Sequence, residues 1–159
     1  MRMKRFGVLA TTVVLAALAL SVAARAGDQH SGTWKMNPAK SMYNPGPAAK
    51  SVTLKIESDE NGLKINAEGI GADGNPTHVE YSAKFDGKDY TITGVPGAEM
   101  VSVKRIDANT VESTIKAGGQ VVMTVRSTVS KDGKTRTSVF KGKDAQGRDV
   151  NNVVVYDKQ

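Results

Sequence analysis

The side chains that could do chemistry are few in this chain, and their spacing assembles no reactive site. The two histidines are His30, which we expect in a frayed N-terminal segment, and His78, which lies beside Glu80 on the polar face of an expected strand. Neither has a second histidine at metal-ligand spacing, and a chain without cysteine has neither thiolate metal sites nor thiol catalysis. No Gly-x-Ser-x-Gly elbow marks a serine nucleophile. The sequence therefore predicts a protein that is not an enzyme and holds no metal or other cofactor.

The elements that position these side chains are expected to be strands, because apolar and polar residues alternate with a period of two. In residues 51–58, Val52, Leu54 and Ile56 fall on one face, and later segments repeat the pattern. No helical stripe of useful length follows residue 26. We expect about ten strands, near residues 33–37, 51–58, 62–69, 77–85, 89–93, 100–106, 109–116, 120–130, 134–141 and 149–156.

Short turns rich in glycine, aspartate and asparagine connect the expected strands. Segments such as DENG, FDGKD and KDGK are typical of β-hairpins, so strands that follow one another should pair antiparallel in an up-and-down meander. An open sheet of this size would leave long exposed edges, which closure removes. The sequence predicts a single all-β domain over residues 27–159, an antiparallel meander closed into a β-barrel, with a β-sandwich as the alternative.

Residues 1–26 have the composition of a secretory signal peptide. A basic head precedes an apolar run, and Ala24-Arg25-Ala26 is a small-x-small cleavage site; an uncleaved membrane anchor is the alternative. We expect an exported protein, periplasmic or extracellular, with no membrane span after cleavage. Cleavage removes four basic and no acidic residues, so the formal net charge drops from +6 to +2. The remaining charges alternate in sign, and we do not expect nucleic acid as a partner.

The first expected strand contains Gly32-Thr33-Trp34, with the only tryptophan of the chain. This Gly-x-Trp opening before an antiparallel meander resembles the first strand of lipocalins and fatty-acid-binding proteins, which together are called calycins. The whole layout, with GTWKMNPAKS, a PGP loop and a terminal VYDKQ, resembles a group of small exported bacterial lipocalin-like proteins. The resemblance implies a calycin-like barrel and supplies no activity.

The resemblance also implies roles for particular residues. A first-strand tryptophan usually plugs one end of such a barrel against a late-strand arginine, so Trp34 is expected to be a structural plug. Fatty-acid-binding proteins hold the ligand carboxylate with an Arg-x-Tyr pair in the last strand. Here Tyr156 keeps the tyrosine, and Val154 takes the place of the arginine. Arg105 shares a face with Val103, so it either points inward and needs a partner or a ligand, or reaches solvent at the end of its strand.

Residues 38–50 form the long connection of the chain. Three prolines and a glycine exclude a regular helix or a central strand there. A connection of this length is either a lid over the barrel or a rigid strap. As a lid, it would cover the lumen with Met42 and Tyr43, its large apolar side chains.

Two functions of different classes fit this sequence. The first is non-catalytic binding of a small hydrophobic or amphiphilic ligand in the barrel lumen, since a ten-stranded barrel is wide and its inward residues are small. Its candidate ligand-binding residues are Met42, Tyr43, Arg105 and Tyr156. The alternative is an envelope or secreted protein-interaction module with a filled β core and no ligand cavity. The sequence specifies no oligomeric state.

Overall fold

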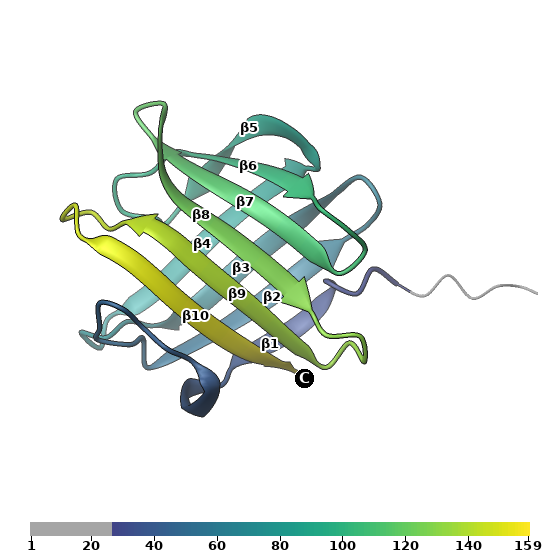
Figure 1. Ribbon diagram of the computed structural model, residues 1–159, viewed down its shortest axis with the longest axis horizontal. Helices are drawn as coiled ribbons and strands as arrows, with labels where there is room; N and C mark the ends of the chain where they lie inside the picture. The colour runs from purple at the N-terminus through teal and green to yellow at the C-terminus, as the bar shows by residue number, and fades with distance from the viewer. Residues whose placement is uncertain (1–26) are drawn as a thin grey trace, which may run out of the picture.

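The computed structural model describes residues 27–159 (Figure 1). The expected signal peptide, residues 1–26, lies outside the described residues, so its cleavage stays a prediction. The described chain forms a barrel of ten strands and one 3-10 turn, η1 (Pro38–Lys40). The strands are β1 (Gly32–Met36), β2 (Ser51–Ser58), β3 (Gly62–Ile70), β4 (Pro76–Lys84), β5 (Asp86–Thr93), β6 (Met100–Arg105), β7 (Thr110–Ala117), β8 (Gln120–Val129), β9 (Thr135–Lys143) and β10 (Asp149–Lys158).

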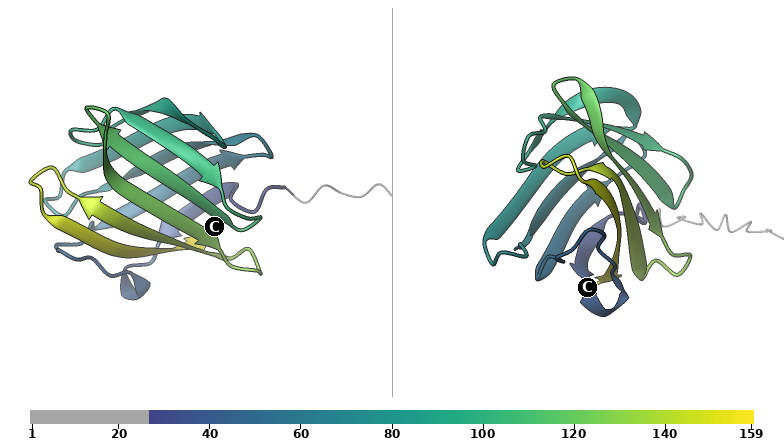
Figure 2. Two further views of the ribbon diagram at one scale, coloured as in Figure 1. Left: turned by 45° about the horizontal axis from the view of Figure 1, so that its top comes forward. Right: turned by 60° about the vertical axis from the view of Figure 1, so that its left-hand side comes forward.

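The strands follow a simple meander. Each pairs antiparallel with its neighbours in the chain, and β1 closes the barrel against β10 (Figure 2). In this pairing, Trp34 lies opposite Lys158 and Met36 opposite Tyr156. The all-β class, the meander and the closure are thus confirmed, and the β-sandwich alternative does not hold. The expected strand bounds agree with the observed ones to within three residues.

Alternation along the strands places the core inside the barrel. In β2, Leu54 and Ile56 are buried, whereas Lys55 and Glu57 are exposed. Burial of each such aliphatic side chain contributes about 1.5–3 kcal/mol. Because the same pattern recurs in the other strands, the inner face of the closed sheet is mainly apolar, with a few buried polar side chains such as Ser127, Arg136 and Ser138.

The two ends of the barrel differ. Gly32, at the start of β1, pairs with Ile56 near the end of β2, so residues 27–31 lie at the end of the barrel that also holds the β2–β3 turn. The connection that leads into the start of β2 lies at the opposite end. We call the first end the floor and the second end the mouth.

The connection 38–50 begins as a strap along β10. Met42 N donates to Val153 O (2.7 Å), Val153 N donates to Met42 O (2.8 Å), and Asn151 N donates to Asn44 O (2.7 Å). This strand-like pairing sends successive side chains to opposite sides. Met42 is therefore 69% exposed, whereas Tyr43 packs against the core.

Candidate ligand-binding cavity

The barrel lumen contains a cavity of about 320 Å3. This volume is near the lower limit of small-molecule pockets, which span roughly 300–1,000 Å3. Much of its wall is apolar and comes from strands all around the barrel, including Leu54, Ile65, Val79, Ile115, Val125 and Phe140. Two other depressions lie on the outer wall, beside β2–β5 and beside β8–β10. The lumen is more enclosed than either outer depression, so it is the candidate for ligand binding.

Strand β9 shows how polarity changes with depth in this cavity. Its cavity-lining side chains are Arg136, Ser138 and Phe140, and successive inward residues are about 6.6 Å apart along a strand. Arg136 pairs with Tyr156 near the end of β10 and lies toward the floor, whereas Phe140 pairs with Asn152 near the start of β10 and lies toward the mouth. The lumen is therefore charged at its floor and largely apolar toward its mouth, where Glu68, Thr77 and Asn152 add polar groups to the rim.

A band of hydroxyl groups separates these two levels. Ser138 Oγ lies 2.8 Å from Ser127 Oγ of β8, and the Tyr81 hydroxyl of β4 lies 3.3 Å from Ser113 Oγ of β7. All four residues line the cavity. Burial raises the pKa of Tyr81, so its hydroxyl keeps its proton at neutral pH and remains able to donate a hydrogen bond.

Arg136 is a buried cation that forms no ion pair with an acidic residue in the described part of the chain. Arg136 is only 2% exposed, and this burial lowers the pKa of its guanidinium. Its one hydrogen bond within residues 27–159 joins Nη1 to His30 Nδ1 (2.7 Å), and its Nε has no partner there. Asp28, whose charge favours the protonated guanidinium, is itself ion-paired with Arg105. A buried arginine without a carboxylate is costly.

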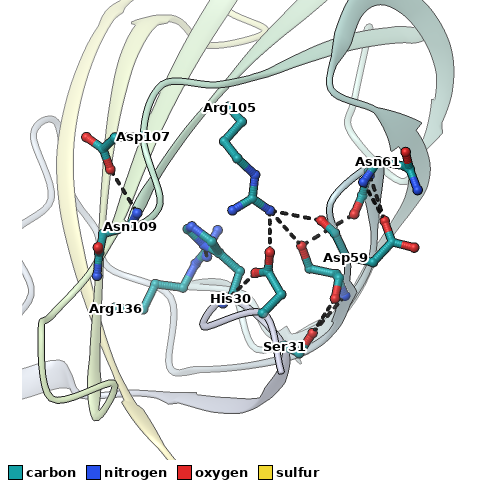
Figure 3. Close-up of polar contacts among 11 residues, drawn as sticks. His30, Ser31, Asp59, Asn61, Arg105, Asp107, Asn109 and Arg136 are labelled. Atoms are coloured by element: carbon teal, nitrogen blue, oxygen red, sulfur yellow. Dashed lines mark hydrogen bonds and ion pairs between the residues drawn. The ribbon is translucent and has the colours of Figure 1, made fainter. Parts of the chain in front are cut away.

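His30 lies at the floor with none of its surface exposed (Figure 3). The expectation of a frayed segment is wrong here, because the histidine is buried against the barrel interior. An arginine can only donate, so His30 Nδ1 must accept and the proton must sit on Nε2. Burial and the charge of Arg136 lower the pKa of His30 to about 4, so the ring is neutral at pH 7. His78, by contrast, lies on the outer face, 3.7 Å from Glu80.

Two of the four residues proposed from sequence to contact a ligand line the cavity. These are Tyr43 and Tyr156, and burial raises the pKa of both. The Tyr43 hydroxyl donates to Met36 Sδ at 3.1 Å. Met42 is on the same segment but faces outward and does not line the cavity.

The fourth candidate, Arg105, lies at the floor but outside the cavity wall. Its Nη2 donates to Asp28 and to Asp59 O (3.1 Å) (Figure 3). Its guanidinium lies 4.3 Å from the centre of the Phe85 ring. The inward charge expected from alternation therefore has a protein partner. Its role in the described chain is to fasten the N-terminal segment.

Trp34 has no exposed surface and is the central residue of β1. Its Nε1 donates to His30 O (3.0 Å), and Lys158 Nζ lies 4.9 Å from its ring centre. The indole packs in the core and is not part of the cavity wall. A late-strand cation does stack on it, but this cation is a lysine rather than the expected arginine.

Sequence reasoning missed Arg136 and His30 as members of one site. Arg136 shares a strand face with Ser138 and Phe140, a pattern that could have placed it inside. His30 precedes the first strand and follows no periodic pattern, so no local signal pointed to its burial.

A function can be argued for this chain from its barrel fold and its cavity rather than from a related protein. The ten-stranded antiparallel barrel is compatible with a calycin-like fold. Within residues 27–159, no group of three or more histidines and carboxylates could hold a metal ion, and no helix is long and apolar enough to cross a membrane. No family model matches this chain, and no curated protein matches it.

Proposed function

We propose that this protein is an exported, non-catalytic binding protein that holds a small amphiphilic molecule in its lumen, with an acidic head group at Arg136 and an apolar tail toward the mouth. The observation that carries the proposal is a buried arginine, without a carboxylate partner among the described residues, at the floor of a largely apolar cavity. The expected signal peptide supports a location in the periplasm or outside the cell.

The charge of Arg136 supports an acidic ligand. An anion beside the guanidinium would offset the desolvation of the buried cation, and the planar fork of arginine matches the two oxygens of a carboxylate. Tyr156 is the cross-strand partner of Arg136, and both residues line the cavity. In the Arg-x-Tyr pair of fatty-acid-binding proteins the arginine stands where this chain has Val154. Here Arg136, on the neighbouring strand β9, lies beside Tyr156 instead.

The shape of the lumen supports a small ligand with one apolar tail. The wall is largely apolar on the mouth side of the hydroxyl band, with Phe140, Val125 and Ile115 in place, and its polar residues there (Glu68, Thr77 and Asn152) lie at the rim. A volume of about 320 Å3 accommodates one short chain or ring system. The protein-interaction alternative assumed a filled core, and the cavity favours ligand binding over it.

Calorimetric titration with decanoate and with decanol tests this proposal, because the two probes share a tail and differ in charge. Decanoate should bind with a micromolar Kd, about −8 kcal/mol. Ala67→Phe, which adds a ring to the cavity wall, should weaken both ligands at least about tenfold, since overfilling a packed space is unfavourable. Lys64→Phe places the same ring on the exposed outer face of the same strand and is the matched control.

Mass spectrometry of small molecules extracted from the natively purified protein would identify the physiological ligand. An acid with one apolar tail is the expected class. If neither probe gives saturable binding and Ala67→Phe behaves like the wild type, the lumen is not a binding site and the interaction module becomes the better explanation.

A further inference from the structure

The N-terminal segment 27–31 is fastened to the barrel floor by contacts with several elements. Ser31 Oγ donates to Ser58 O (2.9 Å) and accepts from Ser58 N (2.8 Å). Asn109 Nδ2 donates to Gln29 Oε1 (2.7 Å). The chain just before β1 is therefore a fixed part of the floor.

The same segment fixes His30 from both sides. Asp28 accepts from the His30 backbone N (2.9 Å) and is ion-paired with Arg105 of β6. The His30 carbonyl accepts from Trp34 Nε1 at 3.0 Å. These contacts fix the backbone of His30, and its complete burial leaves the imidazole little room to rotate, so its Nδ1 is held as an acceptor at one position.

Arg136 depends on that acceptor for its orientation. The bond from Nη1 to His30 Nδ1 (2.7 Å) is the hydrogen bond of its guanidinium within residues 27–159. Arginine has a long, flexible side chain, and one fixed bond limits which edge of its planar fork faces the lumen. A neutral ring at this place orients the cation without adding an anion that would cancel its charge.

We propose that His30 is a positioning residue that makes the lumen selective for acidic over neutral ligands, by holding the guanidinium of Arg136 at the floor. This inference rests on the proposed function and adds the N-terminal segment to the binding site. The groups whose charges act on His30 are Arg136 of β9, Arg105 of β6, Asp28 of its own segment and Asp107 of the β6–β7 turn.

The free-energy cost of burying unpaired donors in the His30–Arg136 pair supports a functional role for the pair. His30 Nε2 and Arg136 Nε are both buried donors without partners in the described chain. Buried polar groups are nearly always satisfied, and exceptions are commonly found at functional sites. An apolar pair would fill the same place without leaving these donors unpaired.

The test measures selectivity, defined as the Kd of decanol divided by the Kd of decanoate. His30→Leu removes the acceptor and should lower the selectivity about tenfold, with the Kd of decanol changed by less than about threefold. His30→Asn places an amide oxygen close to the position of Nδ1 and should restore the selectivity. Arg136→Met sets the value for a lumen without the cation, and His78→Leu, on the outer face, is the matched histidine control.

A merely structural role for His30 predicts a different result. In that case His30→Leu would weaken decanol and decanoate equally, and this outcome, or unchanged selectivity, overturns the inference while leaving lumen binding intact. If the wild type binds neither probe, the proposed function itself fails.

Nitrogen NMR of the wild-type protein tests the inference without relying on any variant. A proton on His30 Nε2, with a bare Nδ1, and a shift of the Arg136 side-chain signal on addition of decanoate are expected. A proton on Nδ1 would overturn the inference, because that nitrogen could not accept from Arg136.

Discussion

Replacing Arg136 with methionine should separate the stability of this protein from its ligand affinity. Within the described residues 27–159, the guanidinium has one hydrogen bond, to His30, and an unpaired Nε. Removing the unpaired donor recovers about 1–3 kcal/mol, and leaving His30 Nδ1 without a donor costs a similar amount. Exchange of buried ionic groups for apolar ones of similar volume is often neutral or stabilising, by about 1–4 kcal/mol. The free energy of unfolding should therefore stay constant or rise by up to about 3 kcal/mol.

The same substitution should weaken acidic ligands. Charge-assisted hydrogen bonds contribute about 1.5–3 kcal/mol, so the Kd of decanoate should rise by roughly 10- to 150-fold. Decanol has no charge for the arginine to bind, and its Kd should change little. A rise in stability together with a loss of acid affinity is the signature of a residue kept for binding.

Urea unfolding, followed by Trp34 fluorescence and circular dichroism, gives the stability, and calorimetric titration gives the affinity. Arg126→Met is the matched control, because Arg126 is exposed on the outer face of β8; it should change neither quantity by more than about 0.5 kcal/mol. The reasoning is refuted if Arg136→Met destabilises the protein by more than about 2 kcal/mol and leaves decanoate binding intact.

Three further results are expected. The pKa of His30 is about 4 in the folded protein and 6.5 ordinarily, so on acidification the unfolded chain takes up this proton before the folded protein does. The free energy of unfolding should therefore fall by up to about 3 kcal/mol as the pH drops from about 6.5 to about 4. Urea titrations of His30→Asn should show no such fall. Trp34→Ala removes the only tryptophan of the chain, so its urea unfolding is followed by circular dichroism alone. The substitution should cost about 3–5 kcal/mol of stability, and a smaller effect would argue against a packed floor. Tyr43→Ala should weaken the binding of decanoate by about 1.5–3 kcal/mol. Met42→Ala, at an exposed position, should leave the affinity measured by calorimetry unchanged. Equal losses of binding free energy in the two variants would mean that the strap moves over the mouth in solution.

The fold could be predicted from the sequence because its determinants are local. Alternation in segments such as residues 51–58 fixes which side chains share a face, and Gly–Asp turns fix the antiparallel order. Ten strands in a meander then close because open edges are unfavourable. The burial of Trp34 and the outward direction of Arg126 and His78 follow from the same local patterns.

The candidate site could be predicted only in part. Tyr43 and Tyr156 were named from the sequence and do line the cavity. Arg105 was named for an inward charge, but a one-strand pattern cannot show that Asp28, far away in the chain, neutralises it. Alternation gives the face of a side chain, whereas the partner of a charge depends on which strands and segments lie opposite.

Only the tertiary structure decided that His30 and Arg136 meet. One residue precedes the first strand and the other lies on the ninth, and barrel closure brings them to 2.7 Å. By itself, the sequence determined an all-β meander with an apolar interior, because a period of two is written into each strand. Closure and register determined that this interior ends in a buried arginine without an ion-pair partner among residues 27–159, because they set what lies across the lumen from each inward side chain.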